Sequence, residues 1–262
     1  MVAGDYLADL FGLEGQVAVV IGGTGVLCGA QALGLAAAGA QVVVAGRDPS
    51  KGAAAVAAIE EVGGLASFQA VDVTSRQSIV ALRDAVVATH GRVDMLINGA
   101  GVNFASAYKD LSDEDWTRVL RSNLDGVHMG CQVFGEQMTA QPEGGSILNL
   151  GSVSAHTPLS RVIAYSASKA AVLNLTQNLA REFATQHVRV NALCPGFFPA
   201  EQNRKILDPD RIESIMARTP MNRFGEPNEL VGTTLLLLSR RAGSFITGAS
   251  FYVDGGFTST SI

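Results

Sequence analysis

Tyr165 and Lys169 are the two residues of this chain whose types and spacing most directly suggest catalysis. They stand four positions apart, so on a helix both side chains project from one face into one small volume. An ammonium beside a phenol favours the phenolate and moves a group with an ordinary pKa of about 10 toward working pH. Such a phenol is suited to act as the general acid/base in a reaction of an alcohol or a ketone.

Ser152 adds a third polar group shortly before this pair. It follows the apolar run 147–150, where a strand would open into a loop, and such strand ends carry the chemistry of open α/β sheets. A Tyr-x-x-x-Lys pair alone is weak evidence, because many helices contain one by chance, with the Tyr packed at the surface and the Lys solvated. The function therefore depends on what the other elements place around the pair.

The composition restricts the class of protein. The 262 residues are 47% hydrophobic, enough to bury one sizeable core, so we expect one domain over residues 1–262. The net charge is −5 and the pI is about 5.4. Because no basic cluster offers a surface to phosphate backbones, we expect a small-molecule partner and no nucleic acid.

The cysteines and the N-terminal segment indicate where the protein works. Cys28, Cys131 and Cys194 are odd in number and widely separated, so we expect small buried residues in a reducing compartment, with no disulfide framework and no metal site. Residues 1–14 contain acidic residues and lack a basic flank, and no apolar run approaches the roughly 20 residues that span a bilayer. The sequence therefore predicts a cytoplasmic protein with no membrane segment.

A glycine-rich turn near the N-terminus indicates a dinucleotide. Residues 16–21 predict a buried strand, residues 22–29 a glycine turn, and the following Ala/Leu-rich stretch a helix to about residue 38. Glycines allow a tight turn and let a pyrophosphate approach the free N–H groups at the helix N-terminus.

The end of the second predicted strand, 41–45, bears on the choice between NAD and NADP. An acid there binds the 2′-hydroxyl of NAD, whereas an arginine accommodates the 2′-phosphate of NADP. Arg47 therefore favours NADP. Asp48 leaves NAD open, and its alternative role is to cap the helix 50–62.

Two further strand ends and one helix carry candidate residues. Asp72 ends the strand 66–71, where it accepts a hydrogen bond from an adenine amino group or caps the helix that starts near Ser75. The strand 93–97 stops in the small residues 98–101, which suggests backbone close to a ligand. Asn123 falls within the predicted helix 113–139, so it either disturbs that helix for a purpose or points outward.

The C-terminal part completes the alternation of strands and helices. A strand at 188–193 ends in Cys194-Pro195-Gly196, and the segment 197–219 mixes aromatics, charges and prolines without a clean period, which indicates an irregular substrate-covering segment. A helix at 226–239 and a strand at 250–253 follow. The pattern predicts an α/β fold with a doubly wound, mostly parallel sheet and right-handed crossovers.

From about residue 13 to residue 256 the sequence resembles the short-chain dehydrogenase/reductase family. The motifs that carry this resemblance are the tetrad Asn123, Ser152, Tyr165 and Lys169, the strand end 98–101, the turn Pro195-Gly196, and the C-terminal signatures 246–248 and 253–256. The resemblance implies a Rossmann fold, reversible hydride transfer between NADP or NAD and a ketone or secondary alcohol, and a homotetramer.

The resemblance also implies roles for single residues. Tyr165 would be the acid/base, Lys169 would hold the nicotinamide ribose, Ser152 would bind the reacting oxygen, and Asn123 would hold a water. The implied cofactor contacts are Gly22, Thr24, Gly25, Val26, Leu27, Arg47, Asp72, Val73, Asn98, Gly99, Ala100, Tyr165, Lys169, Pro195, Gly196 and Phe198. The implied substrate contacts are Ser154, His156, Gln202, Asn203 and Arg204.

The sequence departs from the family pattern at three places: the glycine turn, the strand end and the segment after Pro195. Val26 and Cys28 occupy two of the three glycine places of the turn, so we expect the turn to differ locally. Gly99 replaces the second Asn of the strand-end signature, and Ala200 stands where a Thr commonly contacts the nicotinamide carboxamide.

The glycine turn, the strand end 98–101 and the segment after Pro195 are similar to those of the sugar-acid branch, the fructuronate (mannonate) reductases and gluconate dehydrogenases. Arg204 would pair with a substrate carboxylate while Gln202 and Asn203 bind hydroxyls, and the alternative for Arg204 is a solvated loop residue. Two other functions share these motifs: a non-catalytic dinucleotide sensor and an epimerase or dehydratase with a retained cofactor.

Overall fold

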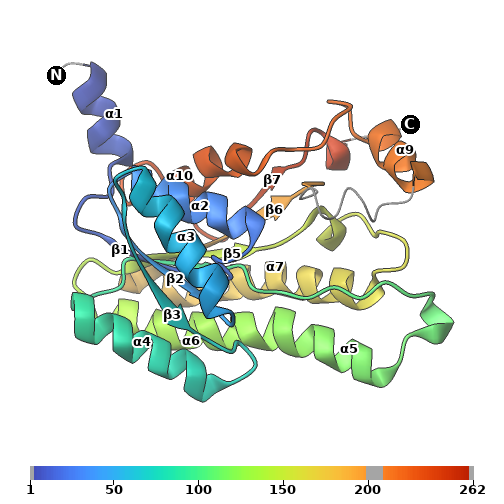
Figure 1. Ribbon diagram of the computed structural model, residues 1–262, viewed down its shortest axis with the longest axis horizontal. Coiled ribbons are helices and arrows are strands. Elements are labelled where there is room, and N and C mark those ends of the chain that lie inside the picture. Colours follow the sequence, from blue (N-terminus) through green and yellow to red (C-terminus); the bar gives the residue numbers. More distant parts are fainter. Residues whose placement is uncertain (1–2, 199–208, 260–262) are drawn as a thin grey trace.

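The protein is built on one parallel sheet with helices on both faces (Figure 1). The structure, a computed structural model, describes residues 3–198 and 209–259, and seven strands of this part form a sheet in the order β3-β2-β1-β4-β5-β6-β7. Every neighbouring pair is parallel, as the sequence predicted. The strands are β1 (Val17–Ile21), β2 (Gln41–Gly46), β3 (Leu65–Ala70), β4 (Met95–Asn98), β5 (Gly145–Leu150), β6 (Val188–Pro195) and β7 (Ser250–Val253).

The central strands are apolar throughout because both faces of the sheet are covered. In β1, for example, Val19 belongs to one core cluster and Val20 to the other. The first cluster includes α4 (Arg76–His90), α6 (Gly126–Thr139) and α7 (Ile163–Phe183). The second includes α2 (Val26–Ala37), α3 (Pro49–Glu61) and α10 (Val231–Leu238), which lie on the opposite face of the sheet (Figure 1).

The strand order reverses between β1 and β4, and this places the ligand crevice. The chain winds outward from β1 to β3, then returns through α4 to β4 beside β1. In open sheets of this kind, ligands bind at the carboxyl ends of the strands at the reversal. The ends of β1, β4 and β5 therefore surround the candidate site.

The first residues of α3 and α4 show which side chains cap these two helices. Asp48 caps α3 by accepting from the backbone N–H groups of Ser50 and Lys51, as predicted. The cap of α4 is Ser75, whose hydroxyl accepts from the N–H of Ser78. Asp72 as that cap was therefore wrong, because its carboxylate bonds instead to the N–H and hydroxyl of Thr74.

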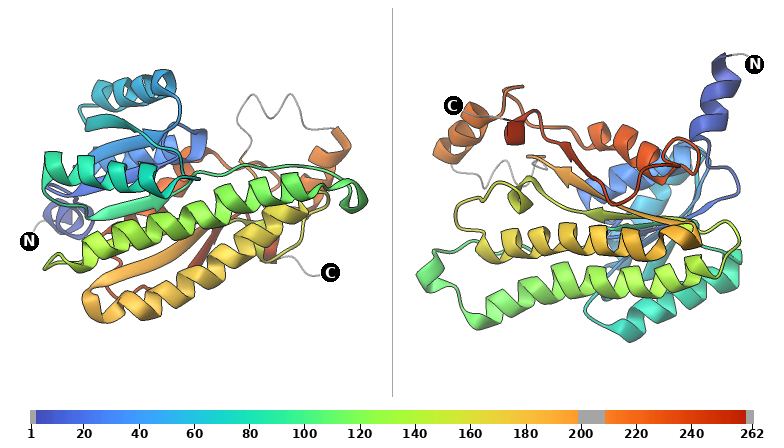
Figure 2. Two further views of the ribbon diagram at one scale, coloured as in Figure 1. Left: turned by 90° about the horizontal axis from the view of Figure 1, so that it is seen from below. Right: turned by 180° about the vertical axis from the view of Figure 1, so that it is seen from behind.

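Three elements differ from the sequence-based expectation. The single helix expected at 113–139 is instead two helices, α5 (Asp113–Leu120) and α6, joined by a π-turn at Arg121–Asp125. These two helices lie beside α7 in both views of Figure 2. Residues 209–218, expected to be irregular, form α9 (Pro209–Arg218). Its proline sits at the first position, where a missing N–H costs nothing. The helix α1 (Ala3–Phe11) was not anticipated.

The apolar side chains near the C-terminus divide between the core and the surface. Leu237 and Leu238 are buried because α10 packs on β5 and β6. Phe257 is buried against the ring of Phe197, while Phe245 is fully exposed. Across the described ranges, none of the helices combines the length and the apolar character that crossing a bilayer requires.

Candidate active site

Three of the four tetrad residues meet where β5 ends against the start of α7. Tyr165 lies in the first turn of α7 and its hydroxyl hydrogen-bonds with Ser152, which follows β5 directly. Lys169 lies one turn further along, and its Nζ donates to the carbonyl of Leu150 at 2.5 Å. The same Nζ lies 5.7 Å from the centroid of the Tyr165 ring. The helical spacing thus brings phenol, ammonium and hydroxyl together, as the sequence predicted.

Ser152 is held by its own loop. Its hydroxyl accepts from the backbone N–H of Ser154 at 3.1 Å, and the Ser154 hydroxyl bonds to it at 3.0 Å. Ser154, a predicted substrate contact, is buried and so serves first to orient Ser152. This arrangement presents the Ser152 oxygen to the same small volume as the Tyr165 hydroxyl.

Asn123 ties the loop after β4 to α7. It lies in the π-turn between α5 and α6, fully buried, where its amide accepts from the N–H of Val102 at 2.8 Å and donates to the carbonyl of Val102 at 2.9 Å. It also bonds to Ser168 at 3.2 Å, and Ser168 donates to the carbonyl of Tyr165. Asn123 therefore disturbs the helix for a purpose, and π-turns of this kind gather at functional sites.

The protonation of the pair differs from the sequence-based expectation. Burial raises the pKa of Tyr165 above its ordinary value, opposed in part by the hydrogen bond from Ser152. Burial lowers the pKa of Lys169 to about 8, opposed in part by the thiols of Cys28 and Cys194. Lys169 does not offset the burial of the phenol, since its Nζ is directed at the carbonyl of Leu150. At neutral pH Tyr165 therefore keeps its proton, which suits donation to a carbonyl oxygen.

The glycine turn fits the pyrophosphate of a dinucleotide. Gly22 has φ +86°, and a Cβ there would lie 2.7 Å from the backbone nitrogen of Ala100. Gly25, the N-cap of α2, gives the first turn no side-chain acceptor, whereas Asp48, Ser75 and Ser112 cap α3, α4 and α5. The first N–H groups of α2 are thus left for an anion. Half of the Val26 side chain is exposed, so Val26 does not crowd the turn, and Leu27 packs against the core.

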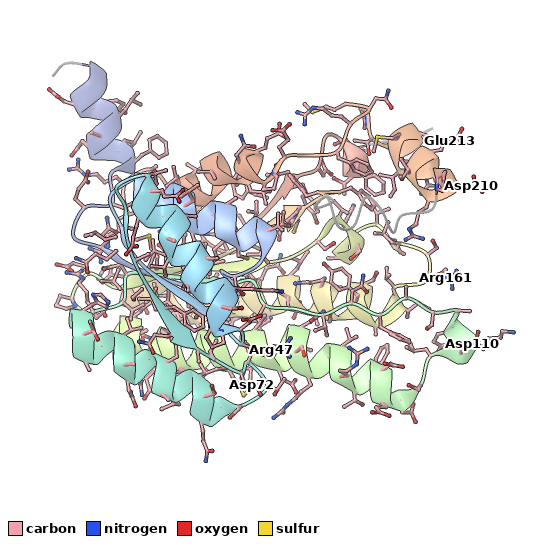
Figure 3. The ribbon with its side chains drawn as sticks, viewed as in Figure 1. Arg47, Asp72, Asp110, Arg161, Asp210 and Glu213 are labelled. Carbon is pink, nitrogen blue, oxygen red and sulfur yellow. The ribbon has the colours of Figure 1, made fainter. Side chains whose placement is uncertain are left out.

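The adenosine end of the crevice lies at the ends of β2 and β3. Arg47 is exposed and lies near Asp72 (Figure 3). Hydrogen bonds from Thr74 lower the pKa of Asp72, with a smaller contribution from the charge of Arg47. Thr24 lies against Gly46, where a Cβ would come within 2.8 Å of the Thr24 hydroxyl oxygen. Val73 is partly buried beside them.

The side chain of Asn98 is bonded inside the protein, so its predicted contact with the cofactor, which stays a prediction, would use the backbone. The side chain is buried and donates to the Asn149 carbonyl oxygen at 3.0 Å and to the sulfur of Cys131. Asn149 in turn donates to Thr176 on α7. This buried network, which the sequence did not reveal, fixes α7 to the sheet, and only the backbone at 98–101 is left to face the crevice.

The ends of β6 and β7 form the far wall. Phe198 packs against Gly225, where a Cβ would lie 2.3 Å from its ring, and Pro195 and Gly196 end β6 beside Asp254. Phe197 stacks edge-on against Phe257 with ring centroids 5.1 Å apart. A hollow of about 390 Å³ between Phe198 and the Tyr252–Gly256 turn adjoins this wall.

The predicted substrate contacts are only partly placed. His156 is exposed and its ring lies 6.1 Å from that of Tyr252. Ala200, Gln202, Asn203 and Arg204 lie outside the described residues.

The structure adds two arginines that the sequence did not single out. A cavity of about 580 Å³ between the loop 158–160 and α9 is lined by Arg211 and Arg218, and Arg211 donates to the Ser160 hydroxyl at 3.3 Å. Figure 3 labels Asp210 and Glu213 on the same helix. The proline and acid that open this segment and the arginine that ends it are helix signals that would have found α9.

Comparison with known proteins agrees with this geometry. The family model described as enoyl-(acyl carrier protein) reductase matches residues 27–258. The uncharacterized oxidoreductase UxuB of Bacillus subtilis (strain 168) is 38% identical over 266 residues, which cover 94% of this chain and 95% of that protein. The 3beta-hydroxysteroid dehydrogenase 1 of Eggerthella lenta is 37% identical over 248 residues, which cover 94% of this chain and 95% of that protein.

A solved structure is similar to this chain over nearly its whole length. The crystal structure of a gluconate 5-dehydrogenase from Burkholderia cenocepacia J2315, in complex with NADP and tartrate, matches with a TM-score of 0.92 at 32% identity and covers 97% of this chain and 100% of that chain. The chain belongs to the short-chain dehydrogenase/reductase family, as its motifs predicted. It is an oxidoreductase that acts on CH–OH groups with a nicotinamide cofactor.

The pKa of Lys169 predicts a pH dependence. Because that pKa is lowered to about 8, the ammonium is lost as pH rises through about 8, and kcat/KM for carbonyl reduction, which reports the free enzyme, should fall there. The neighbouring Tyr165, Cys28 and Cys194 titrate higher, since burial raises all three pKa values. Lys169→Arg should move the fall upward by at least about one pH unit, whereas a wild-type profile that stays flat to about pH 9.5 would contradict the assignment.

Proposed function

We propose that this protein interconverts the ketone and the secondary alcohol of a polyhydroxy acid with NADP(H), using Tyr165 as the general acid/base. The observation that carries the proposal is the Tyr165 phenol hydrogen-bonded to Ser152 and followed one turn later by Lys169, whose Nζ donates to Leu150. A bound nicotinamide supplies or takes up the hydride at the carbon of the reacting C–O bond.

The residues of the site have separate roles in proton transfer, cofactor binding and positioning. In the reductive direction Tyr165 gives its proton to the carbonyl oxygen as that oxygen gains charge, and Ser152 hydrogen-bonds the same oxygen. Lys169 holds the nicotinamide ribose and keeps a positive charge beside Tyr165. Asn123 holds the loop after β4 against α7, and a water bound near it would connect Lys169 to solvent.

Two other functions compete with this proposal. A non-catalytic dinucleotide sensor would need the cofactor crevice alone, and an epimerase or dehydratase would return the hydride to its substrate. The presence of all four tetrad residues, three of which meet around one volume, favours net oxidation or reduction. Turnover followed at the nicotinamide absorbance band, with a panel of ketones and alcohols, separates the three, because only a dehydrogenase changes that absorbance in proportion to substrate.

The structure strengthens the case for NADP over NAD. Asp48 was the residue that left NAD open, and its carboxylate is already used by Ser50 and Lys51 at the start of α3. Arg47 remains exposed beside it at the end of β2. A guanidinium binds a 2′-phosphate through charge-assisted hydrogen bonds.

Arg47→Ala should therefore weaken NADPH by at least about tenfold and NADH by less than about threefold, since only NADPH carries the 2′-phosphate. Fluorescence titration of both cofactors measures the two dissociation constants. Arg181→Ala, in the last turn of α7, removes an exposed arginine elsewhere and should change neither. An equal loss for both cofactors would give Arg47 a structural role and remove the preference for NADP.

A polar, anionic substrate is supported by the charges around the outer end of the crevice. Arg211 and Arg218 line the cavity beside the loop that joins Ser152 to Tyr165 and outnumber the one acid of its lining, Asp210. Arg204 lies in the sequence just before α9. The gluconate 5-dehydrogenase similar to this chain binds tartrate in its crystal, which is a hydroxy acid. The similar 3beta-hydroxysteroid dehydrogenase is named for a steroid, an apolar molecule that would have no use for Arg211 and Arg218.

Replacing Arg204, Arg211 and Arg218 with Ala one at a time tests the sugar-acid proposal. At least one variant should raise KM for a uronate or aldonate by about tenfold or more, the cost of one charge-assisted contact, and change KM little for the matching uncharged polyol or ketose. Arg181→Ala is the control. If all three variants keep the wild-type ratio of the two KM values, the sugar-acid proposal fails while the reductase assignment stands.

Three further proposals complete the account. The segment 197–219, of which residues 199–208 lie outside the described ranges, would cover the bound substrate and exclude water. The protein is a homotetramer in the cytoplasm, supported by the exposed Phe245, the half-exposed edge strand β7 and three free buried thiols. A monomeric mass by light scattering at micromolar concentration would contradict the assembly.

A further inference from the structure

Cys28 and Gly99 form a direct contact between the first turn of α2 and the end of β4. A Cβ built on Gly99 would lie 2.1 Å from the sulfur of Cys28 and 3.2 Å from the carbonyl oxygen of Ile21. Cys28 is 5% exposed, so its one-torsion side chain has little space to move aside. The thiol therefore occupies the volume that any side chain at position 99 would need.

This contact lies inside the part of the turn that faces a dinucleotide. A Cβ on Gly22 would come within 2.8 Å of the Gly99 carbonyl carbon, and the N–H of Gly99 donates to the carbonyl of Ile21 at 2.9 Å. The N–H of Gly25 in turn donates to the carbonyl of Gly22 at 2.9 Å. The glycine turn and the end of β4 are thus in backbone contact. A displacement of Gly99 would therefore shift the N–H groups at the start of α2.

The thiol adds no charge to the site. Burial raises the pKa of Cys28 to about 12, opposed in part by the charge of Lys169, so the thiol is neutral at pH 7. Cys28 therefore acts on its surroundings through its volume.

We propose that Cys28 and Gly99 act as one positioning unit, in which the thiol sets the separation between the glycine turn and the end of β4 and thereby the affinity for the dinucleotide. Both positions depart from the pattern of the family, which has glycine in place of Cys28 and asparagine in place of Gly99. The contact explains why the two departures occur together: the side chain has moved from one partner to the other across one interface. The proposal rests on the cofactor use of the family and is independent of the substrate.

A double-mutant cycle tests the unit with NADPH as the probe and no substrate present. Gly99→Asn alone should weaken NADPH binding by at least tenfold, because the new side chain and the thiol cannot share the space. Cys28→Gly alone should weaken it about two- to fivefold, because it leaves a void beneath the turn. The double variant Cys28→Gly/Gly99→Asn should return to within about threefold of the wild type.

Cys131 provides a matched control. It is a second buried free cysteine, and it contacts Asn98 and Asn149 on the other face of the sheet from α2. Cys131→Ala should not restore NADPH binding to Gly99→Asn. If Gly99→Asn does not fold, Gly99→Ala carries the same cycle, since its Cβ alone meets the sulfur.

The thermal midpoint, measured in parallel, separates a positioning role from packing. We expect the rescue to appear in the dissociation constant of NADPH as well as in the midpoint. If Gly99→Asn weakens NADPH binding by the same factor in the wild type and in Cys28→Gly, the proposal is overturned. A rescue confined to the midpoint, with NADPH affinity unchanged in all variants, would reduce the contact to packing and also overturn it. Because substrate takes no part, neither result bears on the sugar-acid proposal.

Discussion

The burial of the Lys169 ammonium is the constraint on which the rest of the site depends. A buried charge is costly unless it is hydrogen-bonded, and here the carbonyl of Leu150 at the end of β5 accepts a hydrogen bond from the ammonium. No carboxylate appears among the groups that shift its pKa. The ammonium is therefore held by the sheet and left free of an acidic partner, so α7 can present Tyr165 beside Ser152 with its proton in place.

Buried polar contacts make this arrangement rigid. Asn123 holds the loop after β4 against α7 through Val102 and Ser168, and Asn149 holds α7 to the sheet through Thr176. Each of these amides is fully buried, so leaving one unpaired would cost about 1–3 kcal/mol. Asn123 and Asn149, which would not touch the substrate, thus hold in place the residues that would. Such support keeps the geometry of reacting groups to within a fraction of an ångström.

The sequence predicted the parts of the fold that local pattern determines. Apolar runs located the strands, the glycine turn located the start of α2, and the spacing of Tyr165 and Lys169 placed both on one helix face. Side-chain direction was not predictable, because Asn98 turns into the core only once α6 and β5 surround it. The raised pKa of Tyr165 likewise depends on burial that no local pattern shows. The contact of Cys28 with Gly99 joins residues far apart in the chain and appears only in three dimensions.

The central claim is that the ionisable hydroxyl of Tyr165 moves the proton, and Tyr165→Phe tests it most directly. The ring keeps its packing, so the dissociation constant of NADPH should stay within about threefold of the wild type while kcat falls by ~10² or more. Tyr108→Phe, which changes an exposed tyrosine, should leave both values unchanged. A Tyr165→Phe enzyme that retains wild-type kcat would contradict the account.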